Sequence, residues 1–347
     1  MKNTYSFLVL SLMATIVRTP RLCSQERSSV KTRRVEQARL ERIMHGDLGN
    51  GYYRNPVLVG PGSDNSVVRL GKDYYMLAGG GWPDQLVWHS RDLVNWRPVT
   101  RALRKWDGGV WASDITYYKG KLYIYTTQND RSRLDPKNKS LTGAQVSLLG
   151  TTTKAGGDKS FKNVVLWAYD PTGPWSDPID IGVYEVFDPG HIADQEGNRY
   201  LYFNKGIMIQ LTPDGLSTIG DVKQVYDGWE YPDHWVVECM CLEAPKLTYH
   251  NGYYYVASAQ GGTAGPSTAH MGVIARSKSV EGPWENSPYN PIVHTYSQNE
   301  KWWRQGHGTL IDDVEGNWWF LYTGYEKDYT HLGKQSLLLP VEWTGPE

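Results

Sequence analysis

One motif recurs five times along the chain: a β-rich run, a tight turn that contains glycine, and a strand rich in aromatic residues. Successive turn glycines lie 49 to 77 residues apart, which is too far for single hairpins and fits four-stranded sheets with variable loops. Glycine tolerates the positive φ angles of two-residue hairpin turns, and Tyr, Trp, Val and Ile favour strands. The repeat predicts an all-β chain built as a five-bladed β-propeller, with a β-sandwich as the alternative. The turn glycines are Gly71, Gly120, Gly197, Gly252 and Gly316, and the strands after them read DYYML, LYIYT, RYLYF, YYYVA and WWFLY.

The composition agrees with this fold and excludes several partners. The chain of 347 residues has 15 Trp and 24 Tyr against 5 Phe, and its 36 Gly and 19 Pro argue against long helical bundles. Tyr and Trp rings suit half-buried strands and also stack on sugar rings. Lys and Arg number 36 against 37 Asp and Glu, so the charge balance gives no support for a nucleic-acid partner or a basic membrane-binding face.

The N-terminus is typical of an export signal. Residues 5–17 form an apolar run that is too short to span a bilayer, so residues 1–24 are predicted to be a signal peptide, with a buried N-terminal helix as the alternative. Residues 25–50 are predicted to be a charged lead-in and residues 51–347 the propeller. Within it, the polar segment 130–163 is predicted to be a long surface loop of the second blade. We expect a secreted or periplasmic monomer without membrane insertion.

Cross-links are not expected to stabilise the fold. The chain has three cysteines, and Cys239 and Cys241 are two residues apart. In a strand their side chains would point to the same side without readily bridging each other. No C-x-x-C motif is present, which argues against a structural zinc site. Stability is therefore expected to come from the hydrophobic core.

Four acidic residues and one histidine occupy nearly equivalent positions in the repeats. Asp64, Asp114, Asp188, Glu243 and His307 each lie six to nine residues before the turn glycine of their repeat. In a propeller the first strand of each blade lines the central channel, so these side chains are expected to converge near one face. For any single aspartate, a role in a turn or a cap is the alternative.

Convergent carboxylates suit the hydrolysis of a glycosidic bond. When two carboxyl groups stand roughly 6.5 to 9.5 Å apart, one can activate water while the other protonates the leaving oxygen, and the anomeric configuration inverts. A third carboxylate nearby disfavours ionisation of the acid, so the pKa of the acid rises and it stays protonated near neutral pH.

Several segments carry a more specific resemblance, and they occur in the right order on the predicted blades. They are Gly62–Ser66 (GSDNS), Trp111–Asp114 (WASD), Phe187–Gly190 (FDPG), Leu242–Pro245 (LEAP), Gly306–Gly308 (GHG) and Leu337–Trp343 (LLLPVEW). Together they resemble the motifs of glycoside hydrolase family 43, whose members are five-bladed propellers that act on plant polysaccharides. The resemblance covers about residues 53–344.

The resemblance implies roles for the candidate residues. Asp64 is expected to be the general base, Glu243 the general acid, and Asp188 the residue that raises the pKa of the acid. Asp114 is expected to form hydrogen bonds with the substrate at the channel mouth. Lys334 is expected to contact the sugar at a position where family members often have arginine, and lysine lacks the planar fork of that side chain.

Four further residues have expected positions. Trp82 follows three glycines and is expected to form a hydrophobic wall beside the sugar. His307 is expected to face the central channel and, as in many family members, to help hold Ca²⁺ or another cation through water, with packing of the imidazole as the alternative. No cofactor is expected for the chemistry itself. Asp233 and Glu238 are expected to be solvated loop charges, with reach into the pocket as the alternative.

We therefore expect an inverting, exo-acting glycosidase of plant-type oligosaccharides or polysaccharides, either an α-L-arabinofuranosidase or a β-xylosidase. The alternatives are an exo-galactosidase of the same propeller clan and a catalytically silent carbohydrate-binding propeller. Three retained carboxylates favour the enzyme, because binding alone needs no acid of raised pKa. Besides Lys334, a further departure from the family pattern is Asn65, where members often have proline. The sequence ends just past the last predicted strand, so no appended β-sandwich is expected.

Overall fold

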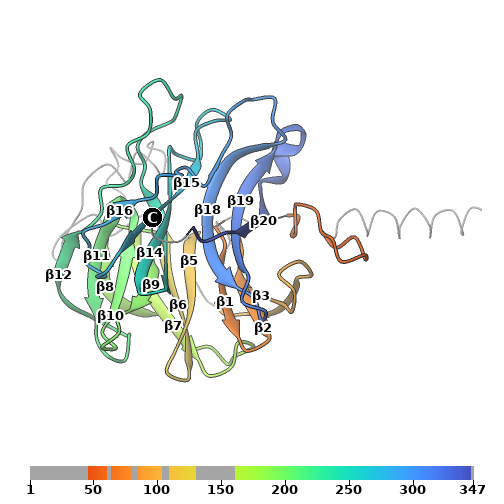
Figure 1. The fold of residues 1–347 in the computed structure, drawn as a ribbon. Coiled ribbons are helices and arrows are strands. Elements are labelled where there is room, and N and C mark those ends of the chain that lie inside the picture. The colour runs from red at the N-terminus through yellow and green to blue at the C-terminus, as the bar shows by residue number, and fades with distance from the viewer. Residues whose placement is uncertain (1–45, 61–63, 80–84, 104–108, 130–160, 345–347) are drawn as a thin grey trace, which may run out of the picture. The chain divides into compact units, whose positions relative to one another are not determined.

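The computed structural model describes residues 46–60, 64–79, 85–103, 109–129 and 161–344. Within these ranges the chain forms five antiparallel sheets that follow one another in sequence order and are arranged as the blades of a propeller (Figure 1). The predicted all-β class and five-bladed architecture are confirmed. Among the described residues, no helix has the length and apolar character needed to cross a membrane.

The first two sheets have four strands each. The first contains β1 (Ser66–Leu70), β2 (Asp73–Leu77), β3 (Leu86–Ser90) and β4 (Arg97–Arg101). The second contains β5 (Gly109–Tyr118), β6 (Lys121–Asn129), β7 (Phe161–Ala168) and β8 (Ile179–Tyr184). Because β7 begins at Phe161, the prediction of a loop over 130–163 is wrong for its last three residues, and the remainder lies outside the described residues.

The third sheet contains β9 (Gly190–Ala193), β10 (Arg199–Phe203), β11 (Ile207–Leu211) and β12 (Thr218–Gln224), with the short 3₁₀ turn η3 (Asn204–Gly206) between β10 and β11. The fourth contains β13 (Glu243–His250), β14 (Tyr253–Gln260), β15 (Met271–Ser277) and β16 (Glu285–Asn286), and β17 (Val293–His294) pairs with β15. The fifth contains β18 (Trp302–Asp312), β19 (Trp318–Glu326) and β20 (Lys334–Val341), with η4 (Lys327–Leu332) before β20.

The recurring motif forms the first hairpin of every blade. Each turn glycine lies between the first and second strands, with φ angles from 62° at Gly71 to 89° at Gly197. The aromatic strands of the motif are the second strands, β2, β6, β10, β14 and β19. Positive φ is costly for residues with a Cβ, so glycine at these positions sets the hairpin and its register.

The cores lie between neighbouring blades. Tyr123 and Val165 of the second blade pack with Leu201 of the third, for example, and Met76 of the first packs with Leu321 of the fifth. Further clusters fill the other interfaces between blades. The apolar side chains that alternate along the strands are thus buried against the next sheet, as in other face-to-face sheet packings.

The ring of blades is closed by a segment from the start of the described domain. The Val57 N–H donates to the Ser336 carbonyl at 2.9 Å, and the Ser336 N–H donates to the Leu58 carbonyl at 3.1 Å. This short bridge covers β20, the outer strand of the fifth sheet. An exposed strand edge invites pairing with other chains, so this closure protects the propeller where its two ends meet.

Candidate active site

The first strands of the blades place most of the candidate residues at one end of the channel. Asp188, Glu243 and His307 each lie nine residues before their turn glycine, and Asp64 lies seven before its own. Asp64, Asp188 and His307 have positive φ angles of 62°, 58° and 48°, and Ala244, beside Glu243, has 55°. Non-glycine residues rarely adopt this region, and its strain concentrates at functional sites.

The candidate base, Asp64, is held by two basic side chains. The Lys334 ammonium donates to Asp64 Oδ1 at 3.0 Å, and His307 Nδ1 lies 3.3 Å from the same oxygen. Burial by itself would raise the pKa of Asp64, but the Lys334 charge holds that pKa well below its usual range. Burial lowers the pKa of His307 to about 3, so its ring is neutral. Asp64 is therefore a carboxylate, and 20% of its side chain stays exposed for a substrate water.

The residue after the base fixes its backbone. The Asn65 side chain donates to the Tyr322 carbonyl at 3.3 Å and accepts from the Ser336 hydroxyl at 3.3 Å. The Asn65 carbonyl accepts from the Thr309 hydroxyl at 3.2 Å. Asn65 is fully buried, so these bonds tie the base to the fifth blade, which also carries Lys334. They offer a physical reason for the asparagine at a position where family members often have proline.

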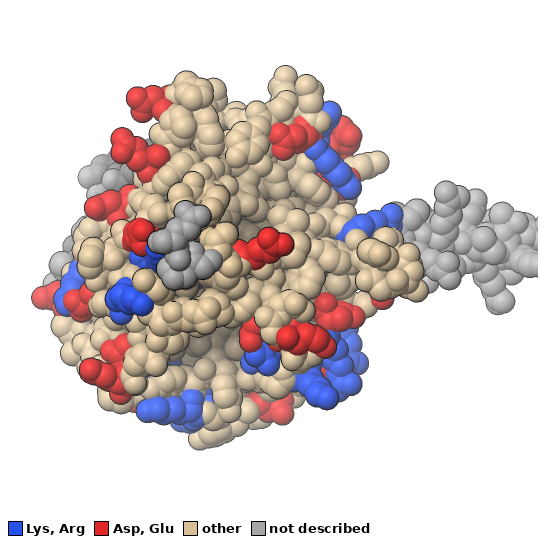
Figure 2. All heavy atoms as spheres, viewed as in Figure 1, with Lys and Arg blue, Asp and Glu red and all other residues tan. Residues whose placement is uncertain are grey.

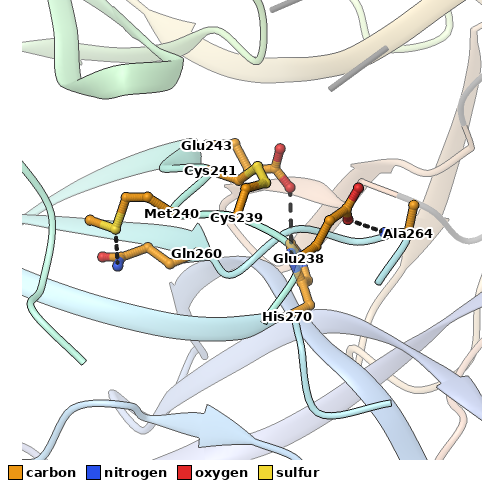
Figure 3. Close-up of a disulfide and its surroundings, with 8 residues drawn as sticks. All are labelled: Glu238, Cys239, Met240, Cys241, Glu243, Gln260, Ala264 and His270. Atoms are coloured by element: carbon orange, nitrogen blue, oxygen red, sulfur yellow. Dashed lines mark hydrogen bonds and ion pairs between the residues drawn. A yellow bond between two sulfur atoms is a disulfide. The ribbon is translucent and has the colours of Figure 1, made fainter. Parts of the chain in front are cut away.

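The candidate acid, Glu243, is the first residue of β13. Its surroundings favour the protonated form, whereas those of Asp64 favour the carboxylate. Burial and then the negative charge of Asp188 raise the pKa of Glu243 well above its usual range. The fully buried His270, from the loop between β14 and β15, lies 3.7 Å from Glu243 by its Nδ1 atom (Figure 3). Burial lowers the pKa of His270 well below its usual range, so a neutral ring lies beside the acid. Glu243 remains 17% exposed and can reach a bound molecule.

Asp188 connects the two sides of the site. Its Oδ2 atom accepts the Ala244 N–H at 3.1 Å, which joins it to the residue that follows the acid. Burial and then the charge of Asp64 raise the pKa of Asp188. Only 5% of Asp188 is exposed, so it acts on its neighbours through charge and hydrogen bonding rather than by broad contact with a ligand.

Asp114 lies deeper in the channel than the other three acids. Its carboxylate accepts the Ser66 hydroxyl at 2.8 Å and the His191 N–H at 3.0 Å, and it forms an ion pair with Lys246 at 3.2 Å. These partners belong to three other blades, so Asp114 joins blades beneath the site rather than forming the mouth of the channel. The spacing contained this signal, because Asp114 and Lys246 both lie six residues before their turn glycines.

Three other sequence predictions have different outcomes. Lys334 belongs to the site, but its contact is with Asp64. Trp82 lies outside the described residues. His307 faces the base, and its Nε2 atom is buried without a partner in the described part of the chain. Within the described ranges, no set of three or more His, Cys, Asp or Glu side chains is arranged to hold a metal ion, and the expected cation held through water stays a prediction.

The segment before the acid differs from the sequence-based expectation. Cys239 and Cys241 form a disulfide with a Cα–Cα distance of 5.2 Å (Figure 3), and the prediction that they would not bridge is wrong. That prediction assumed a strand, whereas Cys241 has a φ angle of 39° and the segment is irregular. Glu238 holds two loops together, because its carboxylate accepts the Ala264 N–H at 2.7 Å. Asp233 is exposed in the same loop, as expected.

Sequence reasoning missed two basic side chains of this region, His270 and Lys246. His270 comes from a loop between the second and third strands of its blade, and no spacing rule marked it. Lys246 lies three residues after Glu243 and donates to the carbonyls of Ser113 and Pro189, at 2.9 Å each. Lys246 lies six residues before Gly252, the same spacing that Asp114 has from Gly120, and this match could have indicated that the two side chains meet.

The fold and the site together define a class: five-bladed β-propellers with one carboxyl group of lowered pKa and one of raised pKa at one end of the central channel. Within this class, the chain belongs to the glycosyl hydrolases family 43, whose family model matches residues 53–346. That match covers most of the chain and includes every described blade.

Individual relatives support the family and divide between two activities. A xylan 1,3-beta-xylosidase of Vibrio is 28% identical over 84% of this chain and 56% of its own. A non-reducing end alpha-L-arabinofuranosidase of Bacteroides ovatus, BoGH43B, is 29% identical over 85% of this chain and 53% of its own. The crystal structure of BlXynB from Bacillus licheniformis superposes with a TM-score of 0.70 at 29% identity, covering 84% of this chain and 54% of that one. The chain thus spans about half the length of the curated relatives it matches.

Proposed function

We propose that this chain is an inverting, exo-acting glycoside hydrolase that releases L-arabinofuranose or D-xylose from plant-type glycans. The observation that carries the proposal is the contrast between two partly exposed carboxyl groups: Asp64 pairs with the Lys334 ammonium at 3.0 Å, whereas Glu243 lies 3.7 Å from the fully buried His270 ring. Asp64 is held ionised beside Lys334, whereas burial and the neighbouring Asp188 keep Glu243 protonated. Hydrolysis of a glycosidic bond requires this division of labour, and the inverting course is the part of the proposal that the configuration of the product tests.

In the proposed reaction, Asp64 accepts a proton from a water molecule whose oxygen attacks the anomeric carbon. The bond between that carbon and the bridging oxygen breaks, and Glu243 gives its proton to the leaving oxygen. Asp188 keeps Glu243 protonated before the reaction, because two negative charges so close together are unfavourable. One water is consumed, and the proton gained by Asp64 balances the proton lost by Glu243.

The choice between arabinose and xylose rests on the relatives, which include both kinds of enzyme. Lys334 contacts the base and can present its remaining donors to a sugar hydroxyl, but as a point charge rather than as a planar fork. We also propose that His307 organises water next to Asp64. We also keep as proposals the two sequence-based expectations that a cation is held there through water and that residues 1–24 direct export.

A panel of aryl glycosides tests the proposal. Nitrophenol release from the α-L-arabinofuranoside or the β-D-xyloside is expected, and NMR of the first-formed sugar should show inverted anomeric configuration. Release only from a galactoside would replace the substrate assignment, and retained configuration would remove Asp64 from the role of base. Binding of the sugars without any turnover would favour a silent carbohydrate-binding propeller.

A further inference from the structure

Aromatic side chains gather on two loops that lead into first strands of blades, and the proposed reaction gives them no role. Trp235 lies between β12 and β13, while His294 ends β17 and Tyr296 follows it. The Trp235 and His294 rings are stacked, with centroids 4.3 Å apart and 9° between their planes. Tyr296 meets both rings edge-on, at 5.8 Å and 4.7 Å. We call these three side chains the aromatic platform.

The topology places the platform at the same end of the propeller as Glu243. Its two loops lead into β13 and β18, the first strands of their blades, and first strands begin at the active-site end. Figure 1 shows both loops, in teal and in blue, rising from one side of the sheets, and the surface between the raised loops is hollowed in Figure 2.

A chain of contacts joins the platform to the acid. The Val236 carbonyl accepts the Thr268 hydroxyl at 3.0 Å, and the Thr268 carbonyl lies 2.9 Å from His294 Nε2. Two residues after Thr268 comes His270, whose ring lies 3.7 Å from Glu243. The platform is thus hydrogen-bonded to the short loop between β14 and β15, and the same loop brings His270 close to the acid.

The loop that carries Trp235 is fixed at both ends. At its start, the buried Gln260 amide accepts the Trp229 N–H at 2.7 Å and donates to the Trp229 carbonyl at 2.8 Å. Near its end, Glu238 accepts the Ala264 N–H, and the disulfide links the two cysteines that precede the acid (Figure 3). A braced loop presents its rings without a further ordering cost, which is what a binding surface needs.

The platform also has the exposure and chemistry of a sugar-binding surface. Tyr296 is 66% exposed and Trp235 is partly exposed, so these rings are not simply part of the core. His294 covers one face of Trp235, and burial lowers the pKa of His294, so the stack carries no charge. Flat apolar rings with polar edges match the apolar face and the hydroxyl rim of a pyranose.

Resting on the proposed function, we propose that the aromatic platform is the leaving-group subsite and binds a pyranose ring of a glycan main chain. Glu243 must touch the bridging oxygen, so the first sugar on the leaving side lies next to Glu243, where the braced loop runs into β13. The substrate class is therefore an oligosaccharide or polysaccharide whose leaving group is itself a sugar. Binding energy at this remote ring contributes to the reaction only when the ring is present.

Two substrates with the same reacting sugar test this subsite. One is an oligosaccharide, whose leaving group is a pyranose, and the other is the glycosyl fluoride, whose leaving group has no ring. Trp235→Ala is expected to lower kcat/KM for the oligosaccharide about 10- to 100-fold and to leave the fluoride nearly unchanged. Trp235→Phe, which keeps an aromatic ring, should recover much of the loss.

The matched control is Tyr289→Ala, because Tyr289 is 62% exposed but lines a groove between the fourth and fifth blades. It should leave both substrates unaffected. Equal losses of both substrates in Trp235→Ala would overturn the subsite and show that the ring only supports the acid loop. Unchanged values for both would overturn it as well. If the unmodified protein hydrolyses neither substrate, the proposed function itself fails.

Discussion

Replacing Lys334 should move the acidic limb of the pH–rate profile. Lys334 is nearly buried and lies 3.0 Å from Asp64 Oδ1. Burial alone would raise the pKa of Asp64, and the ammonium is the main group that lowers it. The base acts as a carboxylate, so activity is lost as pH falls through the pKa of Asp64. A lower pKa extends activity toward acid, and removal of the lysine charge must shift that limit to higher pH.

The size of the shift follows from the ion-pair distance. Two unit charges 3.0 Å apart interact by about 5.5 kcal/mol at an effective dielectric constant of ~20. Since one pKa unit corresponds to 1.36 kcal/mol, this gives an upper limit of about 4 units. Water that enters the space left by Lys334→Met screens the carboxylate. We therefore expect the acidic limb to shift to higher pH by about 1–3 units, the usual range for the loss of an adjacent opposite charge.

The assay is kcat/KM for an aryl glycoside as a function of pH, because this profile reports the groups of the free enzyme. Lys334→Arg keeps the charge and should keep the limb near its original position, even if sugar contacts weaken. Lys223→Met is a matched control, since Lys223 forms an exposed pair with Glu281 at 2.8 Å. An acidic limb that stays in place in Lys334→Met would refute the idea that this lysine controls the ionisation of Asp64.

Four further outcomes are expected. Glu243→Gln should cost an oligosaccharide about 10²–10⁴-fold in kcat/KM and a dinitrophenyl glycoside much less, because a good leaving group needs little protonation; equal losses would show that Glu243 is not the acid. Asp188→Asn should lower the pKa of Glu243 and draw the basic limb of the pH–rate profile to lower pH, since a like charge is removed. Asp114→Ala leaves Lys246 buried without its carboxylate and should lower the free energy of unfolding by about 3–5 kcal/mol in denaturant titrations, whereas adding Lys246→Met should recover part of it. His307→Ala should lower kcat, because Asp64 loses a side chain that holds it in place. Chelation followed by addition of Ca²⁺ measures the effect of any bound ion separately. If neither the substitution nor chelation changes activity, His307 has only a packing role.

The hairpin repeat made the fold predictable. A glycine with positive φ followed by an aromatic strand is a local signal, and each of the five copies forms the first hairpin of a blade. The order of the acids was also readable, since counting back from these glycines located Asp64, Asp188 and Glu243 at the channel end. Asp114 and Lys246 share a spacing of six residues from their turn glycines, and they form an ion pair in the structure.

Irregular segments were not predictable in the same way. The bridge between Cys239 and Cys241 depends on a backbone turn at Cys241, and nothing in a strand-like interpretation of the sequence indicates that turn. His270 and the aromatic platform come from loops whose paths are set by distant partners such as Gln260 and Thr268. Such contacts have no period and no local propensity, so they are absent from any pattern in the chain.

The sequence by itself determined the class of fold and the number of blades, because turn chemistry and alternating hydrophobicity act between near neighbours. Spacing and short motifs also pointed to the three candidate acids. Only the tertiary structure decided the surroundings that favour ionisation or protonation of each candidate acid. The ionisation of Asp64 depends on Lys334, which lies 270 residues away in the chain, and the protonation of Glu243 depends on burial and on the charge of Asp188. Charges act through space, and closure of the ring brings the first and last blades together. That closure places the lysine beside the base and thereby sets the chemistry of the site.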